Sequence, residues 1–414
     1  MRVAYVTDEY PPCRQCGGIG SYVANITQLL VDHGHEVHVF CQKDGISKPT
    51  AGQIIHPVTA WDLPTSILRY AYYRSLGRVV GAVQSRVRWG VSVGRAIRRV
   101  EQDSGRLFDA VEIPEAGGFA GLIKLGGVRS PIVVRMHSGE RMLRRHSGVS
   151  WTCASWLIAL LERWSIRHAD LVTAPSSAII EETRLDLGIS QKSRVLTYPN
   201  PLAQLDVAAG GDDSVRDPFL MLTVGRLCII KGTDLALDAF QLLCDEVPRL
   251  RLVMVGRNLG MSAIDARLQS LERRTSRVVC TGELSALEVE NWMAKAGIVI
   301  VASRFESYSL VTVEALRAGC LVIAARVGAL PEIITHGANG LLFEPGSVQD
   351  LARAVTWALE HSDRCEQLRL AGQAWVREQL APERLLRSIT DAYALAGESS
   401  GWRDLERCEA GGKE

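Results

Sequence analysis

Short apolar runs alternate with longer stretches of helical periodicity along almost the entire chain. The runs are rich in β-branched residues, which is typical of strands buried on both faces of a parallel sheet. In the first half we expect strands at residues 3–7, 37–41, 110–113, 132–135, 171–174 and 195–198. In the second half we expect strands at residues 219–224, 251–255, 278–281, 298–302 and 321–324.

A polar stretch from Gly210 to Ser214 separates the two series and reads as a linker. The alternation of strand and helix on both sides predicts an α/β fold with two doubly wound, Rossmann-like domains. We place the domains at residues 1–205 and 206–381, facing each other across a cleft, and expect a helical tail at 382–414 to cross back to the first domain. Ligands of such sheets bind at the carboxyl ends of the strands, so the loops that follow the strands carry the candidate chemistry.

Composition adds few constraints. The chain has 414 residues, enough for two domains, and a formal net charge of +1, which gives no argument for nucleic acid as a partner. No apolar stretch reaches the length of a membrane-spanning helix, and the first residues read as a strand, so we expect a cytoplasmic protein. Cys13 and Cys16 form a Cys-x-x-Cys pair, but no second pair follows at the spacing of a zinc site, so two free thiols are the simpler interpretation.

Two carboxylates mark the turn after the expected strand at 298–302. Glu306 lies in the turn, and Glu314 lies two helical turns further on. The first amides of a helix that begins near Ser309 lack intrahelical acceptors and favour an anion such as phosphate. Carboxylates on either side can hold hydroxyl groups through charge-assisted hydrogen bonds. This combination suggests a nucleotide sugar as ligand, and a capped surface helix with two solvated acids is the plainer alternative.

A basic loop follows the expected strand at 219–224. Arg226 can bind two phosphate oxygens at once, Lys231 adds a point charge, and Gly225 permits close backbone approach. Such a loop on its own is more often solvated surface. Because the same sheet edge carries the turn at Glu306, a diphosphate site becomes the better interpretation.

These motifs resemble those of the retaining glycosyltransferases of family 4, which have the GT-B fold. Residues 224–232 are similar to the family's Gly-Arg-Leu and Lys-Gly element, and Glu306 to Glu314 is similar to its two glutamates separated by seven residues. Near the N-terminus, residues 9–12 and 17–20 resemble the family's first strand, loop and helix. The resemblance covers nearly the whole chain.

The resemblance implies a role for each matching residue. Glu306 is expected to contact the transferred sugar, and His137 to lie over that sugar near the anomeric carbon. Gly18 is expected to let the backbone approach phosphate or acceptor. The donor's diphosphate, ribose, sugar and base are together expected to contact Arg226, Lys231, Glu314, Gly225, Ser309, Leu310, Val311, Gly282 and Leu284.

The chain departs from the family's pattern in two places. Ser307 and Ser309 stand where members commonly have glycine, which adds side chains beside the sugar. Asn200 and Pro201 replace the usual Asn-Gly before the linker, and because proline fixes φ at about −65°, that turn must differ. We therefore assign no role to Asn200.

Residues 66–100 form a basic arm. The segment contains no acidic residue, and arginines occur at positions 69, 74, 78, 86, 88, 95, 98 and 99. The pattern predicts one or two basic amphipathic helices. Peripheral membrane contact, a solvated helix face and an anion site for the acceptor are the three interpretations that remain.

Three other function classes share parts of this sequence pattern. A nicotinamide oxidoreductase is disfavoured because Val23 stands where the third glycine of a dinucleotide fingerprint belongs, and Cys41-Gln42 stands where its acid belongs. A non-catalytic sugar-binding protein is disfavoured by the complete set of charged site residues. A nucleotide-sugar 2-epimerase shares the GT-B architecture and remains the alternative.

The sequence analysis thus predicts transfer of a sugar from a UDP- or GDP-type donor to a hydroxyl acceptor, without a cofactor. No Asp-x-Asp triplet is present to hold a divalent metal, so we expect Arg226, Lys231 and the helix amides to neutralise the diphosphate. Glu306 and Glu314 are both assigned to donor hydroxyls, which leaves no base for an inverting path. Retention of the anomeric configuration is therefore expected.

Overall fold

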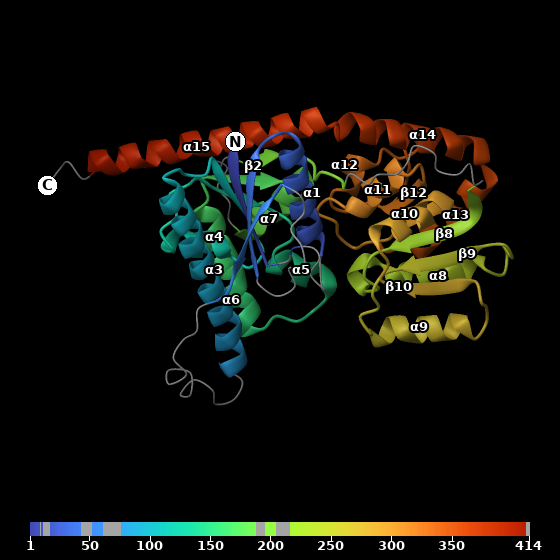
Figure 1. The fold of residues 1–414 in the computed structure, drawn as a ribbon. Helices are drawn as coiled ribbons and strands as arrows, with labels where there is room; N and C mark the ends of the chain where they lie inside the picture. The colour runs from blue at the N-terminus through green and yellow to red at the C-terminus, as the bar shows by residue number, and fades with distance from the viewer. Residues whose placement is uncertain are drawn as a thin grey trace. The chain divides into compact units, whose positions relative to one another are not determined.

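The chain folds into two compact units in the computed structural model, which describes residues 1–8, 10, 17–42, 52–60, 76–187, 195–203 and 216–410. Unit 1 comprises Met1–Ala203 and Pro382–Glu414, and unit 2 comprises Gln204–Ala381. Each unit contains one parallel sheet with helices connecting its strands (Figure 1). The α/β prediction with two Rossmann-like units is confirmed. The expected linker at 210–214 and the cysteines at 13 and 16 lie outside the described residues.

The sheet of unit 1 has seven strands in the order β3-β2-β1-β4-β5-β6-β7. The strands are β1 (Arg2–Thr7), β2 (Glu36–Gln42), β3 (Ile54–Val58), β4 (Ala110–Pro114), β5 (Ile132–Arg135), β6 (Leu171–Ala174) and β7 (Val195–Thr197). Every residue of β1, β4, β5 and β6 is buried, which explains their continuous apolar runs. The sequence analysis missed β3, because this edge strand contains Pro57 and is mostly exposed or half-buried.

The helices of unit 1 connect and cover these strands. They are α1 (Gly18–Asp32), α3 (Leu76–Ser104), α4 (Phe119–Leu125), α5 (Glu140–Ser147), α6 (Cys153–Arg167), α7 (Ser177–Leu187) and α15 (Pro382–Ala410). Helix α15 follows unit 2 in the chain but packs against β4, β5, β6 and α1 of unit 1. Ile389 and Tyr393 of α15 are completely buried.

The basic arm contains one long helix in its described part, α3. Trp89, Val93 and Ile97 recur every fourth residue and are buried, with α4 and α6 packed against this helix. Arg95, Arg98 and Arg99 are exposed, whereas residues 66–75 lie outside the described residues. The apolar face of α3 is therefore part of the core of unit 1.

The sheet of unit 2 has six strands in the order β10-β9-β8-β11-β12-β13. These are β8 (Asp217–Val224), β9 (Arg251–Val255), β10 (Val278–Gly282), β11 (Ala296–Val301), β12 (Leu321–Ala325) and β13 (Leu341–Phe343). The helices are α8 (Thr233–Leu243), α9 (Ser262–Glu272), α10 (Ala286–Lys295), α11 (Leu310–Arg317), α12 (Leu330–Ile333), α13 (Val348–Glu360) and α14 (Ser362–Gln379), with a 3₁₀ turn, η1, at Ile229–Lys231. The three-residue strand β13 was too short to be predicted.

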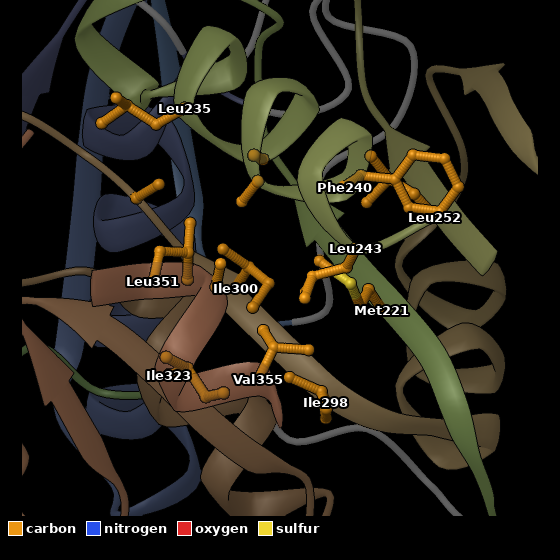
Figure 2. Packing of buried hydrophobic residues seen from close by; sticks show 14 of the residues in the cluster. Met221, Leu235, Phe240, Leu243, Leu252, Ile298, Ile300, Ile323, Leu351 and Val355 are labelled. Carbon is orange, nitrogen blue, oxygen red and sulfur yellow. The ribbon is translucent and has the colours of Figure 1, made fainter. Parts of the chain in front are cut away.

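The core of unit 2 is built from side chains that point from the helices onto the sheet. Leu235, Phe240 and Leu243 of α8 belong to the same buried cluster as side chains from four strands and from α13 (Figure 2). The sheet and α13 contribute Met221, Leu252, Ile298, Ile300, Ile323, Leu351 and Val355. This apolar layer fixes β8 beside β11 and α8 above them.

Both sheets contain a switch point, where the chain leaves one side of the sheet and continues on the other. In unit 2 the switch point lies between β8 and β11, and in unit 1 it lies between β1 and β4. The loops that follow such a pair of strands diverge, which leaves room for a ligand. No helix in the described part of the chain is long and apolar enough to span a membrane.

Candidate active site

The loops after β8 and β11, which flank the switch point of unit 2, are joined by an ion pair. Lys231 Nζ lies 2.7 Å from Glu306 Oε1, and the Ser303 hydroxyl donates to the same oxygen at 2.6 Å. Glu306 is buried, and Lys231 is half-buried. The structure therefore brings together the residue expected to bind the diphosphate and the residue expected to contact the sugar.

Arg304 holds the same two loops in place. Its guanidinium forms a two-pronged contact with Asp234 of α8, at 2.9 and 2.7 Å, and its backbone N–H donates to the Ile230 carbonyl at 2.8 Å. Gly232 allows this close approach, because a Cβ at that position would lie 1.8 Å from the Ala302 carbonyl oxygen. The apposition of Lys231 and Glu306 thus rests on contacts outside the pair itself.

Helix α11 begins beside this pair with an uncapped N-terminus. Ser309 is its N-cap residue, but the hydroxyl is within 2.9 Å of Thr312 Oγ1 and forms no side-chain cap hydrogen bond. No acidic residue lies in the first turn, which contains Leu310 and Val311. Backbone N–H groups at such a helix end favour an anion.

The backbone conformation at Ser309 is one that favours glycine. Its φ of 76° is the only positive value among the non-glycine residues that the structure describes. A side chain in this left-handed region costs about 1–2 kcal/mol relative to the right-handed helix region. The chain therefore keeps the backbone geometry of a glycine turn while placing a hydroxyl group there.

The other expected donor residues lie on the same unit, but no hydrogen bond or ion pair joins them to the pair in the described structure. Arg226 follows β8, is exposed, and forms no hydrogen bond with the described residues. Gly225 bonds to the Val255 carbonyl, and Gly282, at the end of β10, accepts from the Gly256 N–H at 2.9 Å. Leu284 is half-buried before α10.

Glu314 is half-buried on α11. Burial raises the pKa of its carboxyl group, the nearby Arg317 lowers it, and Glu290 raises it further. The carboxyl group accepts no hydrogen bond from the described residues, so its acceptor capacity is available to hydroxyl groups. This environment fits the diol contact that the resemblance implies.

The His137 loop of unit 1 follows β5 and is held by two buried carboxyl groups. The backbone N–H of His137 donates to Glu115 Oε2 at 2.6 Å, and that of Glu140 donates to Glu162 Oε2 at 2.9 Å. Glu162 also accepts from the Gly117 N–H at 3.2 Å, in the turn after β4. These two carboxyl groups fix the loops after β4 and β5 relative to each other.

Burial shifts the pKa values of three side chains at this loop. It raises the pKa of Glu115 to about 8, with Glu162 as the second cause, and it raises the pKa of Glu162 to about 7. Burial and then Arg135 lower the pKa of His137 to about 3. The imidazole is therefore neutral near pH 7, and it contacts the Tyr22 ring edge-on at 4.9 Å. Gly18, at the start of α1, is exposed, with open space where a side chain would lie.

A polar network lies below this loop in the core of unit 1. The carboxylate of Glu112 accepts hydrogen bonds from the hydroxyl groups of Tyr22, Tyr198 and Tyr393, at 2.7, 3.0 and 2.8 Å. Arg135 is completely buried, and its guanidinium lies 4.0 Å from the centre of the Tyr198 ring. Each charge in the core thus has polar or aromatic neighbours.

Asn200 belongs to this network, which corrects the prediction that it has no role. Its side-chain oxygen accepts a hydrogen bond of 2.8 Å from Arg135 Nη2, which also donates to the Tyr198 carbonyl. Proline at position 201 does not disturb this contact, because only the Asn200 side chain is needed. The role that the structure gives Asn200 is to hold Arg135.

Family models match both halves of the chain. The model described as Glycosyltransferase Family 4 matches residues 16–201, and the model described as Glycosyl transferases group 1 matches residues 212–375. Together they account for most of units 1 and 2. The chain belongs to the family 4 glycosyltransferases.

Relatives of this glycosyltransferase include a glycogen synthase from Mycobacterium tuberculosis, 26% identical over 382 residues that cover 87% of this chain and 86% of the relative. A D-inositol 3-phosphate glycosyltransferase from Streptomyces bingchenggensis is 31% identical over 307 residues, or 70% and 66% of the two chains. Among solved structures, Anabaena HepE in complex with UDP and glucose matches with a TM-score of 0.68 and 20% identity, over 94% of this chain and 98% of that one. The structural likeness confirms the GT-B fold.

The sequence analysis missed Glu115, Glu162 and the network around Glu112 in this glycosyltransferase. Glu112 and Glu162 interrupt an otherwise apolar strand and helix, and Glu115 directly follows the same strand as Glu112. An ionisable residue in such a run is seldom buried without partners. That interruption is the signal that could have identified them as buried. Their partners could not be predicted, because Tyr198 and Tyr393 lie far away in the sequence.

Proposed function

We propose that this glycosyltransferase moves a sugar from a nucleoside-diphosphate donor of the UDP or GDP type to a hydroxyl acceptor, with retention and without a metal ion. One observation carries the proposal: the Lys231–Glu306 pair lies at the switch point of unit 2, beside the uncapped start of α11. A cation and free amides suit a diphosphate, and a buried carboxylate suits sugar hydroxyls. The presence of UDP and glucose in the Anabaena relative supports this choice of ligand.

The proposed mechanism assigns leaving-group stabilisation to unit 2. Arg226, Lys231 and the amides at Leu310 and Val311 neutralise the departing diphosphate, which favours a transition state of oxocarbenium character. A departing phosphate oxygen then takes the acceptor's proton on the face that it leaves. The neutral imidazole of His137 fits this path, because a cation there would oppose the developing positive charge.

Lys231 must act while paired with Glu306. The ammonium group has three donors, and the pair uses one of them, so Nζ can bind a phosphate oxygen and keep Glu306 in place. Glu306 in turn uses one oxygen for both Lys231 and Ser303, which leaves Oε2 for a sugar hydroxyl. In this arrangement the ion pair links the diphosphate to the transferred sugar.

A screen of UDP- and GDP-sugars by mass spectrometry, with and without glycoside acceptors, tests the proposal. We expect acceptor-dependent consumption of one donor in the presence of EDTA, and an α-linked product from an α-linked donor by NMR coupling constants. Glu306→Gln should lower kcat more than it raises the donor KM. A β-linked product would contradict retention, and loss of turnover in EDTA that Mg²⁺ or Mn²⁺ restores would contradict the charge assignment.

The alternative activity, 2-epimerisation of a nucleotide sugar, shares the donor site and needs no acceptor. The same screen separates the two activities: an epimer that accumulates without acceptor would replace transfer as the function of the site. The acceptor's chemical class stays open in both cases. Peripheral membrane contact through residues 66–100 also stays a prediction, and the exposed Arg95, Arg98 and Arg99 of α3 are available for it.

A further inference from the structure

Helix α6 is apolar on its outer face as well as on its buried face. Ile158, Ala159 and Ile166 are buried in unit 1, where α6 packs against α3, α4 and α5. The opposite side carries Trp156, Leu157 and Leu160, which are 48, 41 and 51% exposed. A helix on the surface of a unit that faces water normally has polar residues there, so an apolar outer face indicates a binding surface.

The apolar surface continues beyond α6. Leu143 of α5 and Val149 and Trp151 of the connecting loop are also exposed, and Trp151 stacks on Trp156 with ring centres 4.5 Å apart. Six of the fifteen exposed large apolar side chains among the described residues lie within positions 143–160. They are therefore concentrated in one segment of unit 1, which we call the α5–α6 patch: Leu143, Val149, Trp151, Trp156, Leu157 and Leu160.

Basic side chains accompany the patch. The guanidinium of Arg141 lies 5.9 Å from the Trp151 ring centre and 5.3 Å from that of Trp156. Arg141, Arg163 and Arg167 have no ion-pair partner among the residues that the structure describes. The two acids of α5 and α6 are both engaged, Glu140 by Arg144 at 2.7 Å and Glu162 by backbone amides. The segment therefore presents positive charge beside its apolar side chains.

We propose that the α5–α6 patch docks this protein on an anionic lipid bilayer. Tryptophan and leucine side chains suit the boundary between headgroups and acyl chains, and arginines suit the lipid phosphates. A second copy of the chain is the less favourable occupant, because a two-fold interface would place the same unpaired arginines opposite each other. Helix α3 lies beside α6 and adds the exposed Arg95, Arg98 and Arg99, while its Trp89, Val93 and Ile97 are buried.

Co-sedimentation with vesicles tests the proposal with the full-length protein. One vesicle preparation contains phosphatidylcholine alone, and the other contains equal parts of phosphatidylcholine and phosphatidylglycerol. The double variant Trp156→Ser and Leu160→Ser should partition at least about tenfold more weakly than the parent, because it lacks two apolar side chains that the bilayer would bury. The matched control is Leu370→Ser with Leu242→Ser, which removes two equally exposed leucines of unit 2.

The arginines give a second, independent readout. Arg163→Gln and Arg167→Gln should each weaken binding to the anionic vesicles by about fivefold at low salt and leave binding to phosphatidylcholine unchanged. Lipids brominated at the acyl chain should quench the fluorescence of the parent more strongly than that of Trp156→Phe. Thermal unfolding of each variant should match the parent, since every substituted side chain is exposed or half-buried.

The proposal fails if the parent does not bind anionic vesicles, or if the control variant loses as much binding as the patch variant. It also fails if sedimentation velocity shows a dimer that the Trp156 and Leu160 substitutions dissociate, since the patch would then be an interface between copies. None of these measurements needs a sugar donor, so their outcome is independent of the proposed transferase activity.

Discussion

The buried charges of unit 1 and the ion pair of unit 2 in this glycosyltransferase differ in how fully their carboxylates are hydrogen-bonded. In unit 1, Glu112 and Arg135 are buried in the core, and Glu112 is surrounded by three tyrosine hydroxyl groups. In unit 2, Lys231 and Glu306 form a pair that leaves donors and one carboxylate oxygen unused, while Arg226 is exposed. A carboxylate that accepts hydrogen bonds from three buried hydroxyl groups stabilises a fold, and a pair that keeps donors and an acceptor oxygen unused can bind a ligand. Substitutions should therefore change stability in unit 1 and donor binding in unit 2.

The largest expected effect is on the stability of unit 1. Arg135→Met should lower the free energy of unfolding by about 3–5 kcal/mol, because it leaves Glu112 as a buried charge without its neighbouring cation. Arg304→Met in unit 2 removes a half-buried cation from the buried Asp234 and should cost less, about 1–3 kcal/mol, because Arg304 is partly solvated. Urea denaturation measures both. Equal losses would show that the two regions do not differ as described.

The next largest effect is on donor binding by unit 2. Arg226→Ala should weaken the binding of UDP or GDP, whichever the protein prefers, by about 2–4 kcal/mol if a two-pronged phosphate contact is lost. Its unfolding free energy should stay within about 0.5 kcal/mol of the parent, since Arg226 is exposed and makes no hydrogen bond with described residues. Calorimetry that finds unchanged affinity would remove Arg226 from the site. Arg226→Lys is the control that keeps the charge and loses the two-pronged geometry.

Glu314 should show a smaller effect that depends on the ribose. Glu314→Ala should weaken binding of a ribonucleoside diphosphate by about 1.5–3 kcal/mol, because one carboxylate contact to the diol is lost. The 2′-deoxy analogue should lose much less on the same substitution. Calorimetry with both ligands makes the comparison, and equal losses would show that Glu314 does not contact the 2′-hydroxyl group.

The pH dependence of stability should come from the His137 loop. The folded pKa values of Glu115 and Glu162, about 8 and about 7, lie above the ordinary value of 4.5, so the folded state binds these protons more tightly than the unfolded state. Their contribution to stability is therefore complete below about pH 4.5 and is lost as the pH rises through 7 and 8, by at most about 1.4 kcal/mol per pH unit and group. Denaturation midpoints between about pH 6.5 and pH 8 measure the slope, because His137 and His56, whose folded pKa values are about 3 and about 4, oppose it at lower pH. Glu162→Gln should flatten it, and an unchanged slope would assign the effect to other groups.

The smallest effect concerns the start of α11. Ser309→Gly should stabilise the protein by about 0.5–1 kcal/mol, because glycine relieves the positive φ but loses more entropy on folding. Thermal unfolding measures the gain. Ser309→Ala keeps the strain and removes the hydroxyl group, so a gain with alanine as well would mean that the hydroxyl, and not the backbone, is unfavourable.

Local sequence patterns were enough to predict most of the strands, their alternation with helices and the loops that carry the donor motifs. Buried parallel strands are continuous apolar runs, and that signal is local, so β1, β4, β8 and β11 were predictable from their own residues. The edge strands β3 and β13 lack this signal and were missed.

Which side chains meet depends on the packing of segments that are distant in the sequence. Lys231 and Glu306 are 75 positions apart, and they pair because β8 and β11 are neighbours at the switch point. Tyr393 reaches Glu112 across 281 positions, because α15 returns to unit 1 after unit 2 is complete. The positive φ of Ser309 and the exposed outer face of α6 depend in the same way on what packs beside them. Hydrophobic periodicity shows which face of a segment packs against the core, but it does not show which other segment packs against that face.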